Sequence, residues 1–328
     1  MTRTPIYLGA YASLPREARS DARLNDAHLR AAIEATGCTG LEVPWASATF
    51  VPDERLLARL LESCGTHVLT LVAATMEARV DARFGLASLD PDGRRAAVEL
   101  VRRAHAATVE MSDRAGRHVV AAVEVQSAAS VDPSAREAHI AALAGSLHEI
   151  AGWDWRGARV LLEHCDSALG VSPVKGFLPL DDELRAIGSL GRSGVGICVN
   201  WGRSVLETRL TETAVEHVRR ADAEGLLGAR AYSGVSAREN PLGGAWADSH
   251  IAAAGPVATA AGLGSSLLTP AEIASFAAAA RGGLTIVKVN AAEVRAPGSR
   301  GPLEVVVESF SLVQSAVDDA ERKFGLTV

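Results

Sequence analysis

The sequence contains few aromatic residues and few cysteines. Aromatic side chains make up 4% of its 328 residues, and its four cysteines, Cys38, Cys64, Cys165 and Cys198, form no CxxC pair. This spacing does not suit a disulfide framework, and it indicates reduced thiols in a cytoplasmic protein. Because hydrophobic residues still account for 48% of the chain, the core must be filled by alanine, valine, leucine and isoleucine.

The sequence also lacks a cluster of positive charge and a long apolar run. Its formal net charge is −6, which argues against a groove for nucleic acid. The first residues, MTRTPIYLGAY, lead straight into a strand pattern without the apolar segment of a signal peptide, and no apolar run approaches the length of a membrane span. We therefore expect a soluble cytoplasmic protein that binds neither nucleic acid nor membranes but a small polar substrate.

The chain alternates short apolar strands with helices. Strand patterns occur at residues 6–12, 40–45, 67–75, 118–127, 158–167, 195–204, 226–236 and 284–290. Helical patterns occur at residues 26–36, 52–64, 91–112, 134–151, 181–190 and 212–224, after a Thr-Pro cap at 269–270, and at 303–324. Eight βα units predict a (β/α)8 TIM barrel. A doubly wound open sheet is the alternative, but no GxGxxG follows the first strand.

No linker or change of composition divides the chain, so we predict a single barrel domain over residues 1–328. The helix at 303–324 is expected to pack across the barrel bottom or to join a partner subunit. The apolar segment 251–263 can be either a subunit interface or a loop.

Polar side chains end the fifth strand pattern. The apolar run at 160–162 stops at Glu163, His164, Cys165 and Asp166. In parallel α/β folds, sites are built at the carboxyl ends of strands, so Glu163 and His164 are candidate catalytic residues. Burial among apolar side chains would raise the pKa of this carboxyl group toward neutrality, as a general base requires. An isolated Glu-His pair would more often be an ordinary strand end, but other strands end in the same way.

The second and fourth strand patterns contain glutamates within apolar runs. Glu42 interrupts the pattern at 40–45, and Glu124 shares one strand face with Gln126. Buried carboxylates are costly unless they are paired, so these glutamates either contact a substrate or pair with Lys or Arg for structure alone. Further candidate substrate contacts lie at or after the other strand ends: Tyr11, Arg79, Asn200, Trp201, Arg203, Ser204 and Tyr232.

Several of these candidates have a simpler interpretation. Trp201 is either core filling or a stacking surface for a sugar, and Arg203 can pair with Glu207 on the surface of a helix. His250 follows Trp246 and Asp248 in a glycine-rich loop and is either a solvated residue or part of the site.

The chain resembles the xylose-isomerase-like barrel superfamily of sugar isomerases and epimerases. GLEVPW at 40–45 and LLEHCD at 161–166 are similar to strands two and five of that superfamily. The combination of GAYASLP, FGLASLD, EHCD, NWGRSVLETR and WADSH resembles an uncharacterised bacterial subfamily. The resemblance implies sugar chemistry and, as relatives often form dimers or tetramers, a homo-oligomer.

The sequence departs from this superfamily at the metal site. The resemblance implies a strand-five glutamate, a strand-six aspartate, a strand-seven histidine and a strand-eight carboxylate as ligands. Here only Glu163 remains, and the other strand ends carry Asn200, about Tyr232, and Lys288. Because a lysine repels a dication, we favour a site without a metal cofactor. If Mn or Zn is bound, the ligands would be Glu163, Asp248 and His250.

These residues predict an aldose-ketose isomerase or an epimerase that works through an enediolate. Glu163 or His164 would be the base, Asp248 and His250 an acid and its orienting partner, and Lys288 or Arg203 would hold the developing negative charge. There are two alternatives. One is a sugar or polyol dehydratase, which is a lyase, and the other is a non-catalytic sugar-binding barrel. An anionic sugar, such as the sulfonated sugar sulfoquinovose, is predicted from the donors that we expect at the barrel mouth: Arg203, Ser204, Lys288, Arg79, Arg83 and Arg230.

Overall fold

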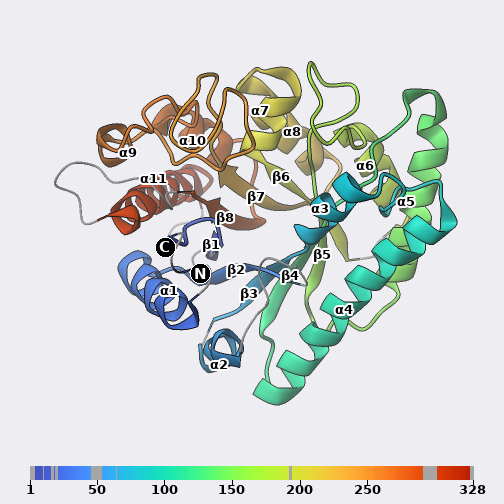
Figure 1. Cartoon of the computed structure of the whole chain (residues 1–328), viewed down its shortest axis with the longest axis horizontal. Coiled ribbons are helices and arrows are strands. Elements are labelled where there is room, and N and C mark those ends of the chain that lie inside the picture. Colours follow the sequence, from blue (N-terminus) through green and yellow to red (C-terminus); the bar gives the residue numbers. More distant parts are fainter. Residues whose placement is uncertain are drawn as a thin grey trace.

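The computed structural model of the chain is a closed barrel of eight parallel strands surrounded by helices (Figure 1). It describes residues 4–9, 11–15, 18, 21–45, 54–63, 65–191, 194–290 and 301–325. Each strand pairs with its neighbour in sequence, and β8 closes on β1. The strands are β1 Ile6–Gly9, β2 Gly40–Pro44, β3 His67–Thr70, β4 Val120–Val125, β5 Arg159–Glu163, β6 Val195–Asn200, β7 Leu227–Ser233 and β8 Leu284–Lys288. The predicted barrel is therefore confirmed.

The helices lie around the barrel, and some of them begin at a side-chain cap. Asp21 caps the first helix and Asp90 the fourth, where Pro91 follows. The segments at 73–80 and 256–260 are helical although the sequence did not predict helices there. Cys64 and the first residues of the helix predicted at 52–64 lie outside the described residues. The helices are α1 Ala22–Thr36, α2 Glu54–Glu62, α3 Ala73–Val80, α4 Pro91–Ala115, α5 Arg136–Ala151, α6 Leu180–Gly188, α7 Trp201–Thr208, α8 Glu212–Ala223, α9 Pro256–Ala260, α10 Pro270–Ala277 and α11 Pro302–Lys323.

Alternate residues of each strand point into the barrel. The interior is filled by one cluster of mostly small or β-branched residues. Its members are Tyr7, Val68, Ala122, Leu161, Cys198, Ala229, Ala231 and Ile286. Because side chains alternate along a strand, the residues two positions further on also point inward, at the carboxyl end of the barrel. In β4, β5 and β8 these residues are Glu124, Glu163 and Lys288, so the strand period alone brings charges to one end of the interior.

The C-terminal helix α11 completes the outer ring of helices. It packs against α10, α1 and α9, next to β8, rather than across the barrel bottom, so that alternative is wrong (Figure 1). The other alternative, contact with a partner subunit, stays a prediction. The apolar face of α11, which includes Val306, Phe310 and Val313, is buried in the large apolar core between the strands and the surrounding helices, which we call the main core. Near the two ends of the described chain, Thr4 donates a hydrogen bond to Glu321.

The segment 251–263 also packs within the chain. Ile251, Ala252, Ala258 and Leu263 are fully buried in the main core, so they are not exposed for a subunit interface. None of the helices within the described residues has the length and apolar character that crossing a membrane requires.

Candidate functional site

The ammonium group of Lys288 lies among three glutamates at the carboxyl end of the barrel. Lys288 Nζ is 2.7 Å from Glu163 Oε1 and 3.2 Å from both Glu42 Oε1 and Glu124 Oε2. All four side chains are fully buried. These residues come from β2, β4, β5 and β8, and we call them the Lys288 cluster. The structure thus brings together four residues that the sequence named separately.

Glu163 is held on both carboxylate oxygens. Gln126 donates to Oε2 at 3.1 Å and Asn200 to Oε1 at 3.0 Å. Arg203 Nη1 lies 2.6 Å from Oε2. The same Asn200 caps α7 by accepting from the backbone N–H of Arg203, so the end of β6 fixes the residue that reaches Glu163. Arg203 therefore contacts Glu163 at the centre of the barrel and does not pair with Glu207.

A second group of charges lies at the rim, around Asp248. Asp248 Oδ2 is 2.7 Å from Lys175 Nζ and 3.3 Å from Arg203 Nε. His250 Nδ1 is 2.5 Å from Ser233 Oγ and 3.7 Å from Asp248 Oδ1. Asp248 and His250 are slightly exposed, at 17% and 12%, whereas the Lys288 cluster is closed off from solvent. The loop that carries Asp248 and His250, which we call the rim loop, thus belongs to the more exposed of the two groups of charges.

Burial and neighbouring charges shift the pKa values of Glu42 and Glu163 in opposite directions. Burial raises the pKa of Glu42 to about 8, and Lys288 offsets this only in part. Burial also acts on Glu163, but Arg203 and Lys288 outweigh it and hold its pKa well below the ordinary value, contrary to the expectation from sequence. Near neutral pH Glu42 therefore carries a proton and Glu163 does not.

The two residues predicted as acid and orienter have lowered pKa values. Burial would raise the pKa of Asp248, but Lys175 and Arg203 bring it well below its usual range. Burial lowers the pKa of His250 to about 4. Asp248 is thus ionised and His250 neutral near pH 7, so Asp248 holds no proton to donate.

Several buried polar atoms around the cluster make no hydrogen bond within the described part of the chain. Besides the two oxygens of Glu42, they include Tyr11 Oη, Thr70 Oγ1, Glu124 Oε1 and Gln126 Oε1. The charges of Glu42 and Lys288 act on Tyr11, which places that hydroxyl beside the cluster. Buried polar groups normally have partners, so these atoms are candidate contacts for the hydroxyl groups of a ligand.

The Lys288 cluster does not fit a divalent metal. Glu124, Glu163 and Cys198 present ligand atoms within 4.8 Å of one another, but Lys288 Nζ already lies against both carboxylates. A second positive ion there would be repelled by the ammonium group. Asp248 is likewise paired with Lys175 and Arg203, so the alternative ligand set of Glu163, Asp248 and His250 is occupied by protein cations.

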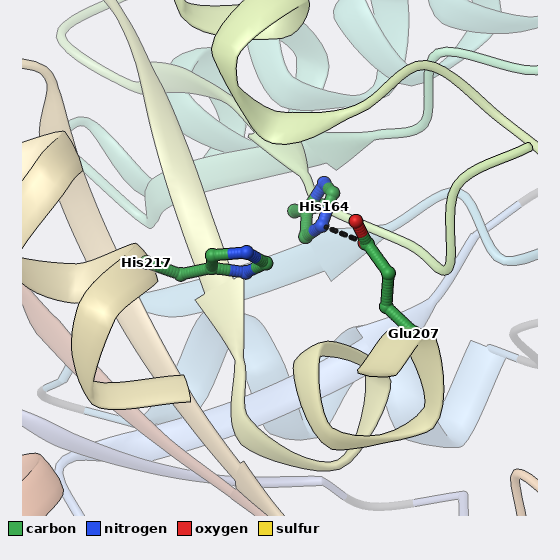
Figure 2. Close-up of side chains that lie close together, drawn as sticks. All are labelled: His164, Glu207 and His217. Carbon is green, nitrogen blue, oxygen red and sulfur yellow. Dashed lines mark hydrogen bonds and ion pairs between the residues drawn. The ribbon is translucent and has the colours of Figure 1, made fainter. Parts of the chain in front are cut away.

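His164 points away from this centre into a separate cluster. Its Nδ1 is 2.8 Å from Glu183 on α6, and its Nε2 is 2.9 Å from Glu207 on α7. The ring of His217 on α8 meets the His164 ring edge-on, at 5.0 Å between centroids (Figure 2). Burial would lower the pKa of His164, but the two glutamates raise it to about 10. Because adjacent residues of a strand end face opposite sides, His164 does not join Glu163 as a base.

Two aromatic candidates belong to the packing of the barrel. Tyr232 points outward and meets the ring of Phe276 on α10 at 5.0 Å, so it is not at the mouth. The residue of β7 that does point inward there is Ser233, one position later. Trp201 is fully buried within the main core, which is one of the two interpretations from sequence.

Most of the donors predicted for an anion lie elsewhere. Arg79 is exposed on α3, and the exposed Arg83 pairs with Asp81 at 2.9 Å. Arg230 points outward and donates to backbone carbonyl groups, including that of Ala277 at 2.6 Å. Ser204 bonds His217 rather than the mouth. Of the predicted set, only Arg203 and Lys288 reach the barrel centre.

The sequence did not identify Lys175, Glu183, His217 or Ser233. Lys175 lies in the loop after β5 and Glu183 and His217 on helices, where no strand period marks them. Ser233 could have been found by counting alternate residues forward along β7 from Ala229 and Ala231, and it is the partner of Lys288 in the β7–β8 register.

Comparisons with known proteins place the chain in a family and a fold. The model of a family described as a domain of unknown function, DUF4862, matches residues 7–299. An uncharacterized protein of Salmonella typhimurium is 32% identical over 252 residues, which are 75% of this chain and 78% of that protein.

Solved structures of sugar epimerases share the fold at low identity. An L-ribulose 3-epimerase aligns with a TM-score of 0.61 and 13% identity, over 99% of this chain and 98% of that one. A D-allulose 3-epimerase from Methylomonas sp. aligns with a TM-score of 0.59 and 15% identity, over 96% and 99%. The chain thus shares the fold of these epimerases and of a xylose isomerase-like TIM barrel, as the resemblance predicted. Because the family model covers most of the sequence, this chain belongs to the DUF4862 family.

Proposed function

We propose that this protein is a sugar isomerase or epimerase that removes a proton next to a carbonyl group and works through an enediolate. The observation that carries the proposal is the Lys288 ammonium group set among Glu42, Glu124 and Glu163. Such a cation can stabilise an enediolate oxygen without a metal ion. The epimerases that share the fold, named for L-ribulose and D-allulose, support the same class of reaction.

Acid and base roles follow from the separated pKa values. Glu163 is ionised and would take the proton from carbon, whereas Glu42, with a pKa of about 8, would donate or shuttle a proton. Both contact Lys288 Nζ, so they would flank a substrate oxygen bound there. When that oxygen takes hydrogen bonds from Lys288 and Arg203, Glu163 loses charge compensation and becomes a stronger base.

The unpartnered polar atoms match a substrate with many hydroxyl groups. Tyr11 Oη, Thr70 Oγ1 and Gln126 Oε1 are buried beside the cluster without a hydrogen bond among the described residues. Each could bond a hydroxyl group of a sugar, and an apolar ligand would leave each of them unsatisfied.

We further propose an anionic sugar, with a sulfonated sugar such as sulfoquinovose as the example to test. Arg203 and Lys175 converge on one oxygen of Asp248 in the rim loop. A sulfonate, phosphate or carboxylate group of the substrate could replace that carboxylate and take its hydrogen bonds. Apart from Arg203 and Lys288, the predicted donors lie away from the mouth. Arg203 and Lys175 are therefore the pair of cations at the rim that supports an anion.

The experiment is solvent exchange measured by NMR. The protein is incubated in D2O with pentoses and hexoses, and with their phosphate, acid and sulfonate counterparts. Deuterium at the carbon next to the carbonyl group, with formation of an isomer or epimer, is the expected result. A dehydrated product would indicate the lyase instead, and an absence of exchange on every sugar would contradict the proposed reaction.

Matched variants separate an enzyme from a binder. Glu163→Gln should keep sugar binding but lower exchange by at least about 100-fold, because loss of a general base typically costs that much. Glu137→Gln, at an exposed position on α5, is the control and should exchange like the wild type. Sugar binding without exchange in the wild type would favour the non-catalytic barrel. Equal affinity for anionic and neutral sugars would remove the proposal of an anionic substrate.

A further inference from the structure

Three potential metal ligands meet outside the barrel, between the end of β5 and helices α7 and α8. One ligand atom each of His164, Glu207 and His217 lies within 4.8 Å of the other two. Figure 2 shows the three side chains coming from separate elements and meeting in the space between them. His164 is fully buried, and only 12% of the Glu207 side chain is exposed. The group does not include any residue of the Lys288 cluster.

Each of these three side chains is held by a further residue through its other polar atom. Glu183 lies 2.8 Å from His164 Nδ1, and Ser204 Oγ lies 3.0 Å from His217 Nδ1. In each histidine this leaves Nε2 as the ring atom available to an ion.

Glu207 is supported in the same way. Ser167 donates to Glu207 Oε1 at 2.9 Å, so the other carboxylate oxygen, Oε2, is the one directed at His164. The supporting Glu183 is itself fixed, because Ser127 donates to it at 2.7 Å. Histidines that bind metals typically donate their second ring N–H to a carboxylate or another oxygen, which fixes the ring and its tautomer.

We propose that His164, Glu207 and His217 bind a zinc ion, which joins the end of β5 to α7 and α8. Two imidazole nitrogens and one carboxylate oxygen are a common zinc ligand set, with a fourth position left for water. Metal binding displaces the proton between His164 Nε2 and Glu207 Oε2. The site is independent of the sugar chemistry proposed above and differs from the barrel-centre site that Lys288 excludes.

The test measures metal binding directly. The full-length protein is stripped with a chelator, titrated with Zn²⁺ or Co²⁺, and analysed for bound metal after gel filtration. We expect one ion per chain, with the visible spectrum of tetrahedral Co²⁺. His217→Gln and Glu207→Gln should lower the affinity by more than about 100-fold, and Ser204→Ala by about 10- to 100-fold because it loosens the support of His217.

Two controls localise the ion. His148→Gln removes an exposed histidine of α5, and Glu163→Gln alters the other group of potential ligands. Both should bind one ion with the affinity of the wild type.

Three results would overturn the site: no stoichiometric metal in the wild type, unchanged affinity in the His217 or Glu207 variant, or loss of metal in Glu163→Gln. Circular dichroism checks the fold of each variant. Should the ligand variants not fold, unchanged affinity in Ser204→Ala would overturn the site by itself.

Discussion

At the scale of single residues, Lys288 places a positive charge where three glutamates point inward. Its side chain is fully buried, and its nearest carboxylate oxygen is at 2.7 Å. Burial alone would lower its pKa, but Glu124, Glu163 and Glu42 raise it well above the ordinary value, so the ammonium group stays charged. One lysine thus contacts all three buried carboxyl groups, of which Glu42 carries a proton near neutral pH and Glu163 also pairs with Arg203.

Replacing Lys288 should therefore destabilise the fold. Lys288→Met keeps the length of the side chain but leaves the buried glutamates without their cation, which should lower the free energy of unfolding by about 3–5 kcal/mol. Urea denaturation at neutral pH measures the effect. Lys323→Met, at an exposed position of α11, is the control and should change stability by less than about 0.5 kcal/mol. A Lys288→Met variant as stable as the control would contradict the pairing.

Glu42 should make stability depend on pH. Because its pKa is raised to about 8 in the folded protein, the folded state holds a proton that the unfolded state loses above its ordinary pKa of 4.5. This contribution is complete below that value and is lost as the pH rises to about 8, by at most about 1.4 kcal/mol per pH unit. Denaturation from pH 5 to 9 should show a flatter profile for Glu42→Gln than for the wild type. Parallel profiles would mean that Glu42 is not protonated in the folded protein.

At the scale of elements, the junction of β6 and α7 positions the site. Asn200 ends the strand, caps the helix and bonds Glu163, and Arg203 follows one turn later. Gly202 allows this helix to approach β7, because a Cβ atom there would lie 2.4 Å from the carbonyl oxygen of Ser233.

Gly202→Ala should push α7 away from β7. We expect a loss of about 1–3 kcal/mol in stability and weaker sugar binding, since Arg203 moves with the helix. Gly145→Ala, in the middle of α5 with no atom within 4 Å of the added Cβ, is the matched control and should stabilise the protein by up to about 1 kcal/mol. Thermal unfolding compares the two, and a neutral Gly202→Ala would show that the close approach is not required.

The strand period explains which candidates reached the site. Glu124 and Gln126 share a face as predicted, and β5 and β8 present Glu163 and Lys288 on the same rule. Tyr232 precedes the inward Ser233, and His164 follows the inward Glu163. Both side chains therefore point outward, toward the surrounding helices. On β7 the inward positions are taken by Ala229 and Ala231, and the ring of Tyr232 packs on Phe276 outside the barrel.

At the scale of the whole molecule, the last helix of the described residues, α11, packs beside the first, α1. It contacts α1 and α10, and its apolar face belongs to the same core as most of the barrel exterior. The single domain over residues 1–328 stays a prediction, and such a domain would unfold in one transition.

Phe310→Ala tests this cooperativity. Phe310 is 2% exposed, and its truncation should lower stability by about 3–5 kcal/mol while shifting the one transition seen by calorimetry. Leu210→Ala, at a position that is 59% exposed, should leave the transition within about 0.5 kcal/mol of the wild type. A separate early transition in Phe310→Ala would contradict the single domain.

The sequence by itself determined the barrel, because the order of strands and helices and the apolar filling are local patterns that repeat along the chain. It also placed Glu124 and Gln126 on one strand face and Glu163 at a strand end, since strand alternation fixes which residues share a face. Which face points inward came from the structure. Only the tertiary structure decided which charges pair, because the loop that carries Lys175, the helix that carries His217 and the rim loop with Asp248 approach the strand ends from distant parts of the chain. Pairing between residues so far apart in the sequence depends on packing in three dimensions, which cannot be predicted from the spacing of neighbouring residues.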